Sequence, residues 1–236
     1  ASPAADVKKG QTVTVTYSGS KKVLGVKAEK KAKAPTLDNT TTAWADGSTY
    51  AVPAGGLTYS AAITVSGDVT LVLTDGETLT LNKGISLAEG ATLTVEGEGT
   101  MNVNGTNGNT SSTVAGSGTL LLTSGTLNAT GGNGADAVGT GSGITANAGG
   151  VAINGAVTVS GGTLTATGGN GGSITGQYRM NCKGGAGGAA ISGALTINGG
   201  TVTTTNGTNG SVGSGCFDCT AGAGGAAAAG GVTDNR

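Results

Sequence analysis

Three cysteines are the most reactive side chains of this 236-residue chain, which contains no histidine. The glycine-rich motif GGAGGAA (184–190) returns as AGAGGAA (221–227), 37 residues further along, and this alignment puts Cys182 and Cys219 at equivalent positions of successive repeats. A disulfide between Cys182 and Cys219, or between Cys216 and Cys219, would tie down a glycine-rich loop. A zinc site would need a fourth ligand, and the nearby candidate is Asp218. The cysteine pattern therefore favours a disulfide over a metal site.

Four carboxylates form the second group with potential chemistry, namely Asp75, Glu77, Glu96 and Glu98. In a chain that repeats every ~23 residues here, they fall on neighbouring turns. Oxygen ligands from adjacent turns suit Ca²⁺, so a structural calcium site is one interpretation, and a solvated corner, which we favour, is the other. Neither arrangement supplies an acid–base pair with a cation that orients a substrate. We therefore expect no enzymatic activity, no catalytic residue and no cofactor apart from that possible Ca²⁺.

The elements that must position these side chains are copies of one strand, best seen in GGTLTATGGNGG (161–172). Polar and apolar residues alternate in every copy with the period of a β-strand. A repeated unit that cannot bury its own apolar face is typical of a solenoid. The aligned polar column contains Thr78, Thr100, Thr126, Thr163 and Thr201, and the aligned apolar column contains Leu79, Met101, Leu127, Leu164 and Val202.

This spacing predicts an all-β chain, a right-handed parallel β-helix of about five coils with a small N-terminal β-hairpin or immunoglobulin-like remnant. We assign residues 1–34 to that hairpin or partial module and its Lys-rich linker, 35–62 to an N-terminal cap, and 63–236 to the β-helix with glycine-rich corner loops. The aromatic residues of the cap segment are interpreted as a plug for the end of the solenoid rather than as a sugar-stacking platform. They are Trp44, Tyr50 and Tyr59.

The repeat spacing then lengthens, and the additional residues form three long glycine-rich loops, at 131–150, 168–188 and 206–225. The core columns continue between them, so all three loops should leave the same corner and lie side by side. Loops displayed on a rigid scaffold are where binding usually resides. We expect the ligand contacts to be the bulky or charged side chains of these loops; in the alternative, the two aromatic ones only pack loop against loop. These residues are Gln177, Tyr178, Arg179, Asn181, Phe217 and Asp218.

Composition and charge exclude several classes of protein. Glycine accounts for 49 of the residues, aromatic residues for 3% and charged residues for 11%. Eight of the 12 basic residues lie within positions 1–33, in a Lys-rich segment without the aromatic residues that stack on bases, so we expect no nucleic-acid partner. No apolar run approaches the ~20 residues that span a bilayer. We interpret the start ASPAADVKKG and the end at Arg236 as the limits of an excised fragment.

Several motifs resemble a known family: WADGSTY (44–50), ITVSGDVTLVLTDGETLT (63–80), and the repeated GTLTATGG together with GAGGAAISG (185–193). They are similar to secreted Gly/Thr-rich right-handed β-helix repeat proteins of gut bacteria, which are carbohydrate-binding-domain-like surface proteins. YSGSKKV (17–23) resembles the end of the immunoglobulin-like modules found in such surface proteins. The resemblance implies an extracellular or cell-surface location and supplies no catalytic residues.

We therefore expect a non-enzymatic extracellular protein, an adhesin, a stalk or a glycan-binding module, whose partner is a polysaccharide or a host or bacterial surface glycan. The alternative is a self-assembling structural subunit of an extracellular filament or of a phage fibre. A third interpretation rests on the outward Thr columns, which resemble the ice-binding face of β-solenoid antifreeze proteins. Asparagine interrupts that array at positions such as Asn102 and Asn128, which weakens the third interpretation.

Overall fold

The computed structural model describes residues 12–16, 25–29, 34–139, 141–176, 179–225 and 228–236. The chain divides into two units, Ala1–Ala34 and Pro35–Arg236. In the first unit, β1 (Thr12–Thr16) and β2 (Gly25–Glu29) pair antiparallel, which confirms the predicted hairpin. Its turn and Tyr17 lie outside the described residues.

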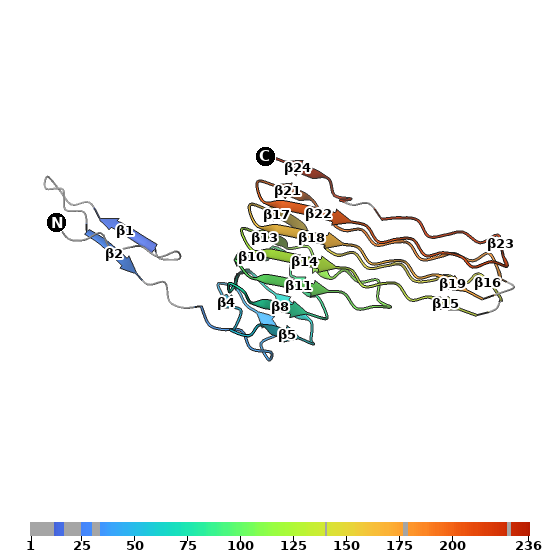
Figure 1. The fold of residues 1–236 in the computed structure, drawn as a ribbon, viewed down its shortest axis with the longest axis horizontal. Helices are drawn as coiled ribbons and strands as arrows, with labels where there is room; N and C mark the ends of the chain where they lie inside the picture. Colours follow the sequence, from blue (N-terminus) through green and yellow to red (C-terminus); the bar gives the residue numbers. More distant parts are fainter. Residues whose placement is uncertain (1–11, 17–24, 30–33, 140, 177–178, 226–227) are drawn as a thin grey trace. The chain divides into compact units, whose positions relative to one another are not determined.

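The second unit is a parallel β-helix, as predicted (Figure 1). Its strands form three sheets, which we number faces 1 to 3 in the order in which the chain visits them. Face 1 contains β3 (Ala43–Trp44), β6 (Ile63–Val65), β9 (Ile85–Leu87) and β12 (Val114–Gly116). Face 2 contains β4 (Thr49–Ala51), β7 (Asp68–Leu73), β10 (Thr92–Gly97), β13 (Thr119–Leu122), β17 (Ala156–Val159), β21 (Leu195–Ile197) and β24 (Val232–Asp234). Face 3 contains β5 (Leu57–Tyr59), β8 (Thr78–Leu81), β11 (Thr100–Asn104), β14 (Thr126–Thr130), β18 (Thr163–Thr167) and β22 (Thr201–Thr205).

The register on face 3 is the one that the repeats predicted. Thr126 pairs with Thr100 on one side and with Thr163 on the other, and Leu127 lies in the next column between Met101 and Leu164. The Thr side chains point outward, whereas Leu127 is buried. Because every coil repeats this alternation, the apolar columns line one continuous interior.

Residues 35–62, expected as a cap, form a further coil, because β3, β4 and β5 pair in parallel with β6, β7 and β8. The aromatic side chains of this coil fill its interior. Trp44 and Tyr59 are fully buried, and the Trp44 ring lies 5.7 Å from that of Tyr50 and 6.5 Å from that of Tyr59. The segment therefore continues the coil and plugs its end with aromatic rings, and Trp44 and Tyr59 offer no surface for stacking on sugars.

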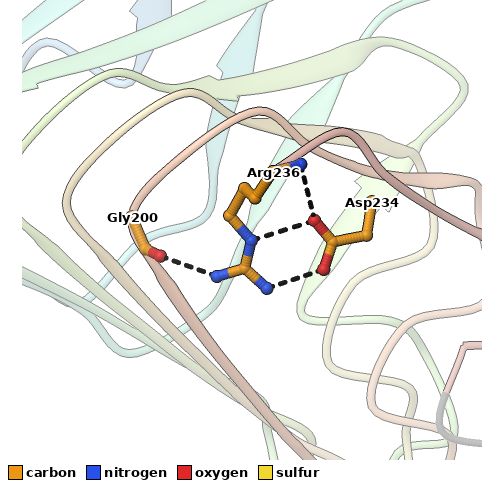
Figure 2. Close-up of polar contacts among 3 residues, drawn as sticks. All are labelled: Gly200, Asp234 and Arg236. Carbon is orange, nitrogen blue, oxygen red and sulfur yellow. Dashed lines mark hydrogen bonds and ion pairs between the residues drawn. The ribbon is translucent and has the colours of Figure 1, made fainter.

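The final coil carries a forked ion pair (Figure 2). The Arg236 guanidinium donates from Nε to Oδ1 of Asp234 at 2.9 Å and from Nη2 to Oδ2 at 2.7 Å. Its Nη1 donates to the carbonyl oxygen of Gly200 on the preceding coil at 3.1 Å. These hydrogen bonds lower the pKa of Asp234 to about 2.

The three predicted loops project from the end of face 3 as long arms (Figure 1). We call residues 131–150 arm 1, 168–188 arm 2 and 206–225 arm 3; each has an outgoing leg, a tip and a return leg. The tips carry short parallel strands in two sheets. These are β15 (Ala137–Val138) with β19 (Ile174–Thr175), and β16 (Gly141–Ser142) with β20 (Arg179–Met180) and β23 (Cys216–Phe217). The prediction that the loops share one corner and lie side by side is confirmed.

Along the part of the chain that the structure describes, no segment forms a helix of the length and apolar character that crossing a bilayer requires.

Candidate functional site: the tips of the glycine-rich arms

The legs are held together by backbone hydrogen bonds that recur at every third residue. Along the outgoing leg of arm 1, every third N–H donates to the carbonyl of the residue that precedes its equivalent on the next coil. A period of three is the repeat of a polyproline II helix, which has no internal hydrogen bonds and leaves its backbone groups available to neighbours. The donor–acceptor pairs are Gly131–Thr167 at 2.8 Å, Gly134–Asn170 at 2.7 Å and Ala137–Ser173 at 2.9 Å.

A second set of hydrogen bonds joins outgoing legs to return legs, so that the arms form two layers. Gly150 in the return leg of arm 1 donates to Gly132 in the outgoing leg at 2.8 Å, and Gly169 in arm 2 donates back to Gly150 at 2.9 Å. The series continues from Gly188 to Gly169 at 2.8 Å and from Gly207 to Gly188 at 2.9 Å. The three arms are thus one hydrogen-bonded slab rather than three independent loops.

Glycine is required wherever the legs approach one another, both between the two layers and within one layer. A Cβ at Gly149 would lie 1.9 Å from the carbonyl oxygen of Gly169, and a Cβ at Gly169 would lie 2.0 Å from that of Gly132. No side chain fits there, so the glycine content of the arms follows from backbone-to-backbone packing, as it does at the axis of collagen.

The third position of each turn faces outward and carries a short polar side chain, which is Asn133 or Asp136 in arm 1 and Asn170 or Ser173 in arm 2. Asn133 Oδ1 accepts a hydrogen bond from the N–H of Asn170 at 2.9 Å, and Asn170 Oδ1 accepts one from the N–H of Thr208 at 2.9 Å. With these side-chain acceptors, the N–H groups on all three sides of the outgoing leg of arm 2 are satisfied. The slab is therefore a stiff support for whatever lies at its tips.

At the tips, β16, β20 and β23 pair in parallel and place Ser142, Met180 and Phe217 in one column. Met180 is 51% exposed and Phe217 is 64% exposed. Val138, on the neighbouring strand β15, is 81% exposed. Large apolar side chains that are exposed next to one another in a folded chain typically mark an interaction surface. We call the column of Met180 and Phe217 the tip face.

The residues after this column share a left-handed backbone. Gly143 has φ of 74°, Asn181 of 53° and Asp218 of 51°. Among the non-glycine residues, Asn and Asp tolerate this conformation best. Asn181 and Asp218, predicted as ligand contacts, thus have a structural reason for their identity as well, and both side chains are exposed beside the tip face.

A small second core lies beneath the tip face. Ile174, Ala146 and Cys182 are buried in it, and Ile144 and Cys219 pack against them. The alignment of successive arms puts Ile144, Cys182 and Cys219 in one column, so the two cysteines replace an aliphatic side chain and act as small apolar groups. This core fixes the tips where the glycine legs provide no side chains.

The six predicted contact residues are distributed as follows. Gln177 and Tyr178 lie outside the described residues. The backbone of Arg179 pairs with Gly141 and Cys216, next to the tip face. Asn181, Phe217 and Asp218 are exposed at the tips, and Phe217 does not fill a gap between loops.

The three cysteines carry unbridged thiols. The backbone N–H of Cys182 donates to Sγ of Cys219 at 3.1 Å, which agrees with the predicted equivalence of these two positions. Burial and the neighbouring Cys219 thiol raise the pKa of Cys182. Cys216 lies on β23, outside the small core.

The four carboxylates proposed as a calcium site are not gathered into one. Within the described ranges, no three Asp, Glu, Cys or His side chains converge on a point that could hold a metal ion. The physical reason is a change in corner length. Four residues separate β7 from β8, whereas two separate β10 from β11, so Asp75 projects at the longer corner instead of stacking beneath Glu96 and Glu98. Glu77 lies at the end of that corner, where its carbonyl accepts from Thr100 at 2.9 Å.

The sequence-based reasoning missed the tip column before Asn181, in particular Met180, and the small core. The alignment held the signal: Ile144 and Ile174 are the large aliphatic residues of otherwise bare glycine segments, and Ile144 aligns with the two cysteines.

No protein-family model, curated protein or solved structure matches the chain. The resemblance to secreted β-helix repeat proteins therefore stays a prediction.

Proposed function

We propose that this chain is a non-enzymatic extracellular surface protein, an adhesin or glycan-binding module, and that the arm tips make the contact. The observation that carries the proposal is the tip face, where Met180 and Phe217 lie exposed side by side on paired strands. Burial of such side chains on a partner is favourable by about 25 cal/mol per Å² of apolar surface removed from water.

The chemistry around the tip face fits a glycan. The apolar face of a sugar ring packs on an aromatic ring, and its hydroxyl groups need hydrogen-bond partners at the edges. Phe217 supplies the ring, Met180 supplies an adaptable apolar neighbour, and the exposed Asn181 and Asp218 supply amide and carboxylate groups. Because successive arms repeat these positions, a polymer could contact more than one arm, and the combined affinity would exceed that of one contact.

The support is well suited to this task. The slab holds the tips at the far end of legs whose N–H groups are satisfied by neighbouring backbone and side-chain oxygens. A ligand therefore does not have to order the loops, which reduces the entropy cost of binding.

The test compares substitutions on and off the tips. Met180→Ser and Phe217→Ser are assayed on a glycan array and by retardation in gels cast with soluble polysaccharides. We expect the Phe217→Ser chain to lose roughly tenfold or more in affinity, within the range seen for truncated aromatic contacts. The control is Val232→Ser, which changes an exposed apolar residue of β24 on the body, 56% exposed, and should leave binding intact.

Light scattering separates this proposal from the structural-subunit alternative. A discrete monomer, with or without added Ca²⁺, fits a binding module. Large regular assemblies, or tip substitutions that leave glycan retention unchanged, would contradict the proposed function.

A further inference from the structure

Two cysteines of the small tip core, one from arm 2 and one from arm 3, are in contact with each other. Cys182 is 2% exposed, and Cys219 packs against the same core with part of its surface in solvent. Sγ of Cys219 accepts a hydrogen bond from the N–H of Cys182 at 3.1 Å, across 37 residues of chain.

The backbones on both sides hold these cysteines in parallel register. Asn181 donates to the carbonyl of Phe217 at 3.0 Å just before them, and Thr220 donates to the carbonyl of Cys182 at 2.9 Å just after them. Parallel neighbours lie about 4.8 Å apart, which is inside the Cα separation of roughly 4.4–6.8 Å that a disulfide spans. The matching left-handed residues before them direct both side chains the same way, into the small core.

We propose that Cys182 and Cys219 are a crosslinking pair, whose disulfide ties the tip of arm 2 to the tip of arm 3. The crosslink depends only on the two thiols and forms whether or not the tips bind a glycan.

The reaction is thiol–disulfide exchange with a small disulfide such as oxidised glutathione. The more exposed Cys219 loses its proton and attacks one sulfur of the small disulfide, which releases one small thiolate and leaves a mixed disulfide on Cys219. Cys182 then loses its proton and attacks Sγ of Cys219, which expels the second small thiolate. The two protein thiols have lost two electrons and two protons, and the small disulfide has gained them as two thiols.

The third thiol is not an equivalent partner. Cys216 lies on β23 in register with Arg179, in the column that precedes the tip face, and it is not part of the small core. A bond between Cys216 and Cys219 would have to pull the Cys219 side chain out of that core. The geometry therefore assigns the disulfide to Cys182 and Cys219 and leaves Cys216 as a thiol.

The experiment uses the full chain, incubated with oxidised or reduced glutathione, alkylated under denaturing conditions and weighed by mass spectrometry. We expect the alkylatable thiols to fall from three in the reduced chain to one after oxidation. Peptide mapping, with cleavage between Phe217 and Asp218 to separate Cys216 from Cys219, should link the peptide that contains Cys182 to the one that contains Cys219.

The decisive variant is Cys216→Ser, which alters a residue outside the small core. In this variant oxidation should remove every alkylatable thiol, because Cys182 and Cys219 can pair only with each other. Thiols that survive in oxidised Cys216→Ser, or a disulfide at Cys216 itself in the unaltered chain after cleavage between Phe217 and Asp218, would overturn the assignment. So would dimers held together by disulfides on a non-reducing gel.

Discussion

In the coils, opposite walls are separated by buried side chains such as Leu127 and Leu164, whereas in the arms the two layers lie backbone against backbone. The coils thus gain stability from apolar surface removed from water. The arms remove little apolar surface and rely on hydrogen bonds between backbone groups and on the close approach that glycine allows. The chain contains both kinds of packing, and the coils and the arms meet at the end of face 3.

The junction shows how one packing mode gives way to the other. The last inward column of face 3 runs from Leu81 through Val103 to Ala129 and Ala166, so its side chains shrink where the arms begin. Small side chains there let the chain leave the coil with its two legs close together. The buried Thr113 caps this point, and its Oγ1 donates to the carbonyl of Thr130 at 2.9 Å.

The difference in packing between coils and arms also predicts that each glycine leg depends on the legs beside it for its order. Glycine loses more conformational freedom on folding than any other residue, so a single glycine leg is costly to order. Each leg is therefore ordered by the ones beside it. The segment after β11 supports arm 1 as a half-length leg, because Gly105 donates to Thr130 at 2.8 Å and Gly108 donates to Asn133 at 2.7 Å.

The largest effect on stability is expected in the coils, when a large buried side chain is replaced by a small one. Leu164→Ala leaves a cavity in the interior of β18 and should lower the free energy of unfolding by about 2–5 kcal/mol. Urea denaturation followed by circular dichroism measures this loss. The control is Thr165→Ala, an outward neighbour, which should change the free energy of unfolding by less than roughly 0.5 kcal/mol. Equal losses for both variants would show that the coils are not held by their interior side chains.

The opposite change, in which a glycine is replaced by a residue with a side chain, should disturb the packing of the arms. A Cβ at Gly222 would lie 1.9 Å from the carbonyl oxygen of Gly185, whereas a Cβ at Gly224 meets Asn209 Oδ1 at an ordinary 3.6 Å. Gly222→Ala should displace the return leg of arm 3 at a local cost of about 1–3 kcal/mol. Faster amide hydrogen exchange in arm 3, with slow exchange kept in β14 and β18, is the expected result.

Gly224→Ala is the matched control, since it lies on the same leg and carries no left-handed φ. It should leave exchange in arm 3 unchanged or slightly slower, because alanine restricts the unfolded chain more than glycine does. If both substitutions speed exchange equally, close backbone approach is not what orders the arms.

The coils could be predicted from the sequence because side chains with a period of two leave registered columns. Thr126 and Leu127 align with their counterparts in other repeats, and the structure keeps that register. The first coil was harder to recognise, since it has Trp44 and Tyr59 where the next coil has the aliphatic Val65 and Leu81, and these rings suggested a cap.

The positions of the arms could be predicted from the sequence, but their internal structure could not, because glycine leaves no side-chain pattern from which to infer packing. What their sequence does contain is a period of three, with a short polar residue at every third position, such as Asn133 and Asp136 or Asn170 and Ser173, the repeat of a polyproline II helix. At the tips, Asn181 and Asp218 were predicted only as ligand contacts, although their alignment with Gly143 is a signal for the left-handed backbone that the structure shows. The four carboxylates predicted as a possible calcium site do not converge, because the corners that carry them differ in length by two residues. Column alignment does not reveal that difference.

The smallest effect on stability is expected from acid, which should weaken the turn at Asp38 in the first coil. Asp38 Oδ1 accepts hydrogen bonds from the N–H groups of Thr40 and Thr41, both at 2.9 Å, and from their hydroxyl groups. These bonds lower the pKa of Asp38 from 3.8 to about 2. Tyr59 donates from its hydroxyl to the carbonyl of Asp38, so this turn holds the aromatic plug of the first coil.

A folded-state pKa below the ordinary value means that the Asp38 contribution is present above pH 3.8 and disappears as the pH falls towards 2. The chain should therefore lose thermal stability across this window, modestly because the carboxylate is exposed. Asp38→Asn cannot titrate and should reduce the loss in this window to the part that comes from Asp234, whose pKa is also lowered to about 2, whereas Asp75→Asn, at the exposed corner between β7 and β8, should leave the loss unchanged. Tyr and Trp fluorescence against pH reports the plug, and hydrogen exchange reports the arms. Since the bonds that join the legs run mainly between backbone groups, which do not titrate, acid should loosen the aromatic plug while the slab stays protected. Loss of protection in the arms before the plug opens would mean that the slab, and not the end of the coil, depends on these charges.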